Sequence, residues 1–132
     1  MSYCLDTDIL IYLVNGAPDV AAQVAARDMN ELCISTVAAM EVMTGFEKKP
    51  GQPLRIERFN DLLSLVTVLP FDLEDARAAA KIRAVLERIG LKIGPQDMQI
   101  AGQALRRGLT LVTHNVRHFK RVPGLVAEDW SV

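Results

Sequence analysis

The chain has 132 residues, a length that fits one domain with its own hydrophobic core, residues 1–132. Half of the residues are hydrophobic and 23% are charged, a composition that excludes an intrinsically disordered protein. The net charge of −1 argues against a protein that binds nucleic acid through a basic surface spread over the whole molecule, although local basic patches remain compatible with it.

Apolar runs and helical spacing predict short strands that alternate with helices along the whole chain. In chain order we expect a strand at 2–5, a helix at 7–14, a helix opening at 19, a strand at 32–35, a helix at 36–46, a helix at 56–66, a strand at 66–69, a helix at 72–89, a helix from 95, a strand at 110–113 and a short strand at 125–127. Ser35 is a plausible N-cap, and Pro95 suits the first helical position. This alternation favours an α/β sandwich around a mostly parallel sheet.

The cysteines and the first residues of the chain indicate the cellular compartment that we expect for the protein. Cys4 and Cys33 lie in apolar runs without a disulfide-like spacing, which predicts reduced thiols in the core of a cytoplasmic protein. Met1-Ser2-Tyr3 lacks the basic segment of a signal peptide. Acids or prolines interrupt each apolar stretch before it reaches the length of a membrane span, so we expect no membrane association.

Three windows contain carboxylates but no base. Residues 3–14 hold Asp6 and Asp8, whereas Glu41 is the only charged residue of 33–46 and Asp97 is the only one of 93–105. A carboxylate in apolar surroundings is costly unless something compensates its charge. Because no Lys or Arg lies nearby in sequence, a hard divalent cation such as Mg²⁺ or Mn²⁺ is the natural compensating group.

The positions of these acids support a common site, although simpler roles stay open. Asp6 follows the first strand and Glu41 lies on the helix that leaves the second, and ligands of parallel sheets bind beyond these carboxyl ends. Asp6 or Asp8 is also a suitable helix cap, and Asp97 suits the first turn of a helix through the helix dipole. Glu41 has no such capping use.

Taken in order, the motifs of the whole chain resemble those of the PIN-domain ribonucleases, and within them the VapC toxins of bacterial type II toxin–antitoxin systems. The resemblance rests on Leu5-Asp6-Thr7-Asp8, Ile34-Ser35 with Met40-Glu41-Val42, Ile93-Gly94-Pro95-Gln96-Asp97, Leu111-Val112-Thr113-His114-Asn115, Arg117-His118-Phe119, and the ending from Val122-Pro123-Gly124 to Glu128-Asp129-Trp130.

The resemblance implies a three-layer α/β/α fold and Mg²⁺- or Mn²⁺-dependent endonucleolytic cleavage of RNA, with transfer RNA as the substrate we expect. It implies that Asp6, Glu41 and Asp97 are the metal ligands and that Thr113 and Asn115 line the same pocket. It also implies a cognate VapB-like antitoxin and a homodimer. A divalent cation suits this chemistry because it activates water and stabilises charge on the phosphate.

Two positions depart from the family pattern, and one segment is the expected RNA contact. Asp8 stands where the family often has Asn, and His118 stands where a further acid is common, which leaves open whether one metal ion or two would bind. RNA contacts are expected chiefly from Arg117, His118, Lys120 and Arg121, with Lys48-Lys49 and Arg106-Arg107 as further candidates.

Two other functions fit part of the sequence. Asp6-Thr7-Asp8 at a strand end mimics the nucleophile motif of haloacid-dehalogenase-type phosphatases, but Thr113-His114-Asn115 occupies the region where that class needs an acid pair. An inactive binding module that keeps the fold is the second alternative, supported only by His118. Comparing hydrolysis of p-nitrophenyl phosphate with hydrolysis of RNA distinguishes a phosphatase from a ribonuclease. Titration with Mn²⁺ distinguishes an inactive binding module from the enzyme, because the module should bind Mn²⁺ no better than an Asp97→Asn variant does.

Overall fold

A computed structural model describes residues 2–132 of the chain. Its elements are β1 (Tyr3–Leu5), α1 (Thr7–Val14), α2 (Pro18–Ala25), the 3-10 helix η1 (Met29–Glu31), β2 (Leu32–Ser35), α3 (Thr36–Lys48), α4 (Pro53–Leu65), β3 (Thr67–Leu69), α5 (Leu73–Arg88), α6 (Pro95–Arg106), β4 (Thr110–Val112), α7 (Val116–Phe119) and β5 (Ala127–Glu128). The α/β prediction is therefore confirmed.

The five strands form one sheet in the order β3-β2-β1-β4-β5, and every neighbouring pair is parallel. β1 is central, with Cys4 in register with Cys33 of β2 on one side and Leu111 of β4 on the other. The chain builds outward from β1 first through β2 and β3 and then through β4 and β5. The direction of winding thus reverses between β1 and β4, the position where open parallel sheets bind ligands.

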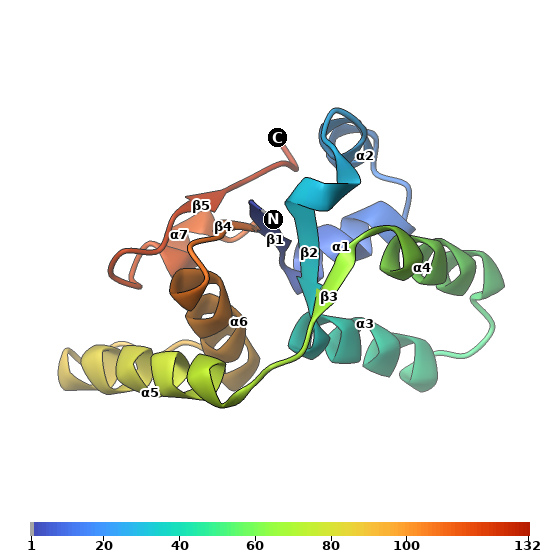
Figure 1. Ribbon diagram of the computed structural model, residues 1–132. Helices are drawn as coiled ribbons and strands as arrows, with labels where there is room; N and C mark the ends of the chain where they lie inside the picture. The colour runs from blue at the N-terminus through green and yellow to red at the C-terminus, as the bar shows by residue number, and fades with distance from the viewer. Residues whose placement is uncertain (1) are drawn as a thin grey trace.

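Helices cover both sides of the sheet, which gives the expected three layers (Figure 1). α5 and α6 pack against each other as a hairpin on one side, while α1, α2 and α4 lie on the other. The core is mainly aliphatic, with Leu5, Ile34 and Leu111 of the strands fully buried. No helix within residues 2–132 is long and apolar enough to cross a membrane.

Several local predictions are confirmed or corrected by the packing. Cys4 and Cys33 are buried free thiols, as expected. α4 starts at Pro53 rather than near 56, because the proline at its first position tolerates the lack of an N–H partner there. The short α7 was not predicted, since four residues are too few to show helical periodicity.

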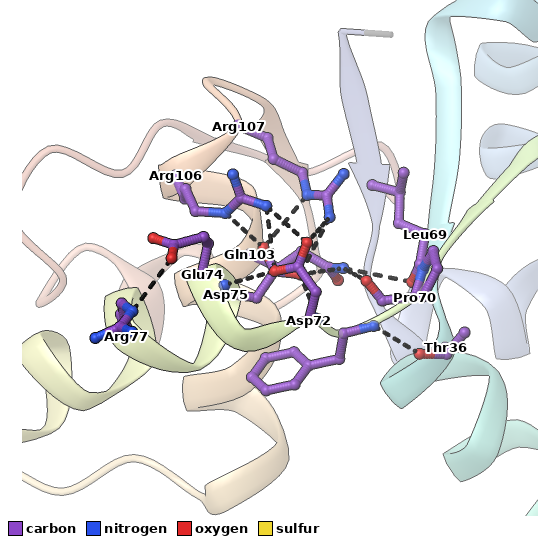
Figure 2. A network of polar contacts seen from close by, with 11 residues as sticks. Thr36, Leu69, Pro70, Asp72, Glu74, Asp75, Arg77, Gln103, Arg106 and Arg107 are labelled. Carbon is purple, nitrogen blue, oxygen red and sulfur yellow. Dashed lines mark hydrogen bonds and ion pairs between the residues drawn. The ribbon is translucent and has the colours of Figure 1, made fainter.

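An ion-pair network joins the start of α5 to the end of α6 and engages two arginines that were further candidates for RNA contact (Figure 2). Arg106 and Arg107 both pair with Asp72 and with the fully buried Asp75, whose Oδ2 also accepts a hydrogen bond of 3.0 Å from Gln103 Nε2. Burial raises the pKa of Asp75, but hydrogen bonds from Arg107, the Asp72 N–H and Arg106 outweigh it and hold the pKa at about 2. These arginines are engaged in packing two helices and are not a free basic patch.

Candidate active site

Asp6 lies at the carboxyl end of β1, next to β4. It directly follows β1 and precedes α1, and the residue is only 4% exposed. Its Oδ1 accepts a hydrogen bond of 2.8 Å from the Thr7 N–H, and its Oδ2 accepts one of 2.8 Å from the Thr113 hydroxyl. Asp6 therefore caps α1, which was the simpler of its two expected roles, while its carboxylate also faces the end of β4.

The surroundings of Asp6 disfavour its negative charge. Burial, followed by the charge of Asp8, raises the pKa of Asp6 to about 7, against the opposing effect of the hydrogen bonds from Thr113 and Thr7. The charge of Asp97 contributes to the same increase. Asp97 thus lies close enough to Asp6 to act on it electrostatically, although 91 positions separate them in the sequence.

Asp8 connects the first turn of α1 to the turn after β4. Its carboxylate accepts hydrogen bonds of 3.2 and 3.3 Å from the His114 N–H. The Thr113 hydroxyl lies 3.4 Å from Asp8 but 2.8 Å from Asp6, and its single proton goes to the nearer oxygen. Asp8 thus holds the β4 turn against α1. Burial raises its pKa, and its charge, when present, raises the pKa of the neighbouring Asp6.

Glu41 reaches the same region from α3. Ser35 caps this helix by accepting a hydrogen bond of 3.1 Å from the Val37 N–H. One side of α3 packs on α1, and there the Thr7 hydroxyl donates a 2.7 Å hydrogen bond to Glu41 Oε1. Thr7 therefore connects Asp6 to Glu41, because its N–H binds the first and its hydroxyl binds the second. We did not single out Thr7 from the sequence, although it lies inside the first motif.

Asp97 has a partner that sequence proximity could not reveal. His118 Nε2 lies 3.3 Å from Asp97 Oδ2, with side chains that are 20% and 36% exposed respectively. The nitrogen is buried and has no hydrogen-bond partner of acceptable geometry, so the contact becomes an ion pair when the imidazole is protonated. No Lys or Arg lies near Asp97 in sequence, but the short α7 brings His118 to the start of α6 in the folded chain.

The four carboxylates Asp6, Asp8, Glu41 and Asp97 form no ion pair with Lys or Arg within the described residues. Between residues 2 and 132, no three His, Cys, Asp or Glu side chains are gathered tightly enough to hold a metal ion as they stand. The predicted acids are therefore linked through Thr7 and through their electrostatic effects on Asp6, but in the described residues they are not assembled as one ligand set. Their oxygen donors and uncompensated charge nevertheless fit a hard divalent cation.

The polar turn contacts Asp6 through Thr113, and the basic segment follows this turn in the chain. Thr113 is fully buried, and its hydroxyl oxygen accepts a hydrogen bond of 3.1 Å from the Asn115 N–H. Asn115 is exposed at the start of α7, where its side chain caps nothing. Arg117, Lys120 and Arg121 are exposed and have no ion-pair partner in the described chain.

The C-terminal tail contributes a contact that the sequence did not indicate. His114 Nδ1 lies 2.8 Å from Ser131 Oγ and 3.3 Å from Asp129 Oδ2. Trp130 between them is buried, with its ring edge-on to Tyr3 and beneath the Arg27 guanidinium. The tail therefore holds the turn that carries Thr113 and Asn115. These are long-range contacts between polar residues, for which single-sequence patterns give no signal.

Comparison with known proteins identifies the family to which this fold belongs. The PIN domain family model matches residues 3–125. The chain is 37% identical to the tRNA(fMet)-specific endonuclease VapC of Shigella flexneri, over 99% of both chains, and 35% identical to that of Salmonella typhimurium, over 98% of both. Among solved structures, it is similar to DNA-bound VapBC from Salmonella typhimurium, with a TM-score of 0.91 and 34% identity over 98% of both chains. It is also similar to VapBC2 from Rickettsia felis bound to a promoter DNA fragment, with a TM-score of 0.90 and 31% identity over 98% of this chain and 99% of the other.

Proposed function

The chain belongs to the PIN-domain family, as one of its VapC-type toxin ribonucleases, and on this premise we propose that it cleaves transfer RNA with Mg²⁺ or Mn²⁺ held by Asp6, Glu41 and Asp97. The observation that carries the metal proposal is the group of carboxylates around Asp6. Thr7 connects Asp6 to Glu41, the charges of Asp8 and Asp97 act on Asp6, and no Lys or Arg of the described chain pairs with these acids. Membership of the PIN-domain family also argues against a haloacid-dehalogenase-type phosphatase, the alternative suggested by the Asp6-Thr7-Asp8 motif.

The chain's own residues set up this chemistry. Thr7 and Thr113 fix both oxygens of Asp6, and Thr7 also holds Glu41, so two candidate ligands are oriented by one threonine. A bound divalent cation would supply an activated water and charge stabilisation at the phosphate. Its charge would also lower the pKa of Asp6 and keep that carboxylate ionised at neutral pH.

The exposed basic segment of Arg117, Lys120 and Arg121, which follows the polar turn in the chain, supports RNA binding. Each phosphate contact releases counterions, so the salt dependence of binding reports how many contacts are made. The double substitution Arg117→Ala/Arg121→Ala should weaken RNA binding and reduce the slope of log affinity against log salt, without changing Mn²⁺ affinity. The matched control is Lys81→Ala/Lys92→Ala, which removes two exposed cations from the α5–α6 hairpin. An unchanged slope in the first variant would assign its arginines to a solvated surface.

We further propose that a VapB-like antitoxin neutralises the chain and that the chain forms a homodimer. The support is that the similar structures from Salmonella typhimurium and Rickettsia felis are VapBC complexes. Expression of the chain alone should arrest growth, and coexpression of an antitoxin encoded beside its gene should relieve the arrest. Normal growth at high levels of the wild-type protein would contradict the toxin role.

The substrate itself is found by sequencing RNA 5′ ends after induced expression in cells. We expect new ends concentrated in one transfer RNA, because the similar enzymes of Shigella flexneri and Salmonella typhimurium are named as specific for tRNA(fMet). The Asp97→Asn variant is the control and should give no new ends. Equal ends in the wild type and in this variant would contradict the proposed activity.

A further inference from the structure

The segment that follows β5 grips the turn after β4 through three polar side chains. We call His114, Asp129 and Ser131 the tail clamp. His114 Nδ1 lies 2.8 Å from Ser131 Oγ and 3.3 Å from Asp129 Oδ2. The hydroxyl and the N–H of Ser131 both donate to Asp129 Oδ1. The three side chains therefore form one closed set of polar contacts between the turn and the tail.

The number of protons in the tail clamp fixes the direction of its hydrogen bonds. A serine hydroxyl carries one proton, and that of Ser131 goes to Asp129. The Ser131 oxygen can then only accept from His114, so Nδ1 of the imidazole carries a proton. Burial acts to raise the pKa of Asp129, but the hydrogen bonds from Ser131 and the charge of His114 outweigh it and lower this pKa. Asp129 is thus kept ionised as the acceptor of the clamp.

The turn that the clamp grips also holds the carboxylate of Asp6. The Thr113 hydroxyl donates a 2.8 Å hydrogen bond to Asp6 Oδ2, and the N–H of His114 binds Asp8. The Thr113 N–H donates a 2.9 Å hydrogen bond to the carbonyl oxygen of Glu128. The turn is therefore held from two sides, by the acids at the start of α1 and by the tail.

We propose that the tail clamp positions the metal site: by fixing the turn, it keeps the Thr113 hydroxyl on Asp6 and so raises the affinity for a divalent cation. His114 is then a positioning residue that contacts neither the metal nor the RNA. This inference rests on the proposed function, in which Asp6 holds the cation. Groups that hydrogen-bond to a metal ligand typically contribute roughly 10- to 100-fold to metal affinity or activity. Thr113 is such a group, and the clamp acts one step further from the cation.

The exposure of the clamp separates this role from a role in stability. The side chain of His114 is 53% exposed, and that of Asp129 is 18% exposed. Ion pairs this close to solvent contribute little to the free energy of unfolding, so the protein should stay folded without the clamp. A binding site, in contrast, needs its groups held within about 0.5 Å of the productive geometry. Loss of the clamp should therefore affect metal binding far more than folding.

His114→Ala is the first test, because it removes the clamp and keeps the backbone N–H that binds Asp8. Calorimetric titration with Mn²⁺ in the absence of RNA should show about tenfold weaker binding than the wild type, the lower end of the range for groups around a ligand. The substitution removes positive charge whenever the imidazole is protonated, so electrostatics alone would strengthen cation binding. Weaker binding therefore reports the lost position of the turn.

Three further variants separate the hydrogen bonds of the clamp from its bulk. His114→Asn should restore most of the Mn²⁺ affinity, because its amide group can donate in place of the Nδ1–H. Ser131→Ala should lose less than His114→Ala, since Asp129 still contacts the imidazole. Ser64→Ala is the matched control and should match the wild type, because it removes an exposed hydroxyl of α4 that donates a 2.6 Å hydrogen bond to the Asp61 carbonyl.

Single-turnover cleavage of a tRNA(fMet) transcript gives the second readout. At a Mn²⁺ concentration that half-saturates the wild type, His114→Ala should cleave several-fold more slowly, with an unchanged enzyme concentration for half-maximal rate, and excess Mn²⁺ should restore the rate.

Three results would contradict this inference in different ways. Unchanged Mn²⁺ affinity in His114→Ala, with a higher enzyme concentration for half-maximal rate, would overturn the clamp and make His114 an RNA contact. Unchanged Mn²⁺ affinity with a lower resistance to urea would overturn it and leave the clamp a feature of folding alone. A wild type that binds no Mn²⁺ would contradict the proposed metal site itself, and the clamp's role with it.

Discussion

Asp6 carries a buried carboxyl that two threonine groups hold and that two other acids oppose, with a pKa of about 7. Between about pH 4 and 7 the native state keeps a proton that the unfolded chain has lost, so this residue makes the free energy of unfolding fall as the pH rises through that window. A bound cation offsets the penalty, which explains why such a group can be retained at a metal site.

Asp6→Asn should therefore stabilise the metal-free protein. The gain over the wild type should be larger at pH 8 than at pH 5 by on the order of 2 kcal/mol, because the wild-type penalty is complete only above the folded pKa. Urea unfolding in EDTA at the two pH values measures this difference. Asp19→Asn is the control, since Asp19 is exposed and should show no such change. Equal gains at both pH values would contradict the assigned pKa.

His118 is the second residue whose surroundings suggest a role, because it contacts Asp97 at 3.3 Å. If it contacts phosphate or water rather than the metal, His118→Ala should lose roughly 10- to 100-fold in cleavage rate with both Mg²⁺ and Mn²⁺. His118→Asp should retain activity. Adding Mg²⁺ should increase the melting temperature of this variant more than that of the wild type, because the substitution places an oxygen ligand beside Asp97. Single-turnover rates and thermal melts measure the two effects. A His118→Ala variant equal to the wild type with both metals would make this histidine a bystander.

At the scale of elements, the hairpin of α5 and α6 positions Asp97, and its packing depends on one glycine. A Cβ at Gly102 of α6 would lie 2.7 Å from the backbone nitrogen of Ala79 on α5. Gly102→Ala should therefore force the helices apart and cost about 1–3 kcal/mol of stability. Gly45→Ala on α3 should have the opposite sign, with a gain of about 1 kcal/mol, because its Cβ meets nothing and alanine favours the helix. Urea unfolding of both variants measures this, and a stabilised Gly102→Ala would contradict the packing.

Periodicity explains which elements could be predicted from the sequence. Apolar runs and helical spacing located the five strands and the six longer helices to within a few residues, because these elements are long or apolar enough to show a pattern. The sequence did not predict α7 and η1, because a single helical turn is too short to show a hydrophobic period. The ion pairs of Arg106 and Arg107 could not be predicted, because their partners Asp72 and Asp75 are about thirty residues away in sequence and meet them only in the folded hairpin.

At the scale of the molecule, the order of strands explains why distant acids could be assigned to one site. β1 and β4 become neighbours across the reversal of the sheet, which brings Asp6 to Thr113 over a separation of 107 residues. Uncharged windows identified Asp6, Glu41 and Asp97, but a sequence gives no distances. It could not show that Thr7 connects two of them or that His118 meets the third.

The central claim is that these acids hold one divalent cation for RNA cleavage, and single-turnover cleavage of a tRNA(fMet) transcript tests it most directly. With Mg²⁺ or Mn²⁺, the wild type should cleave at one position, and EDTA should stop the reaction. Asp6→Asn, Glu41→Gln and Asp97→Asn should each abolish cleavage while remaining folded, whereas the exposed control Asp61→Asn should match the wild type. Full activity in any two of the three site variants, or a wild type that leaves RNA intact with either metal, would contradict the account.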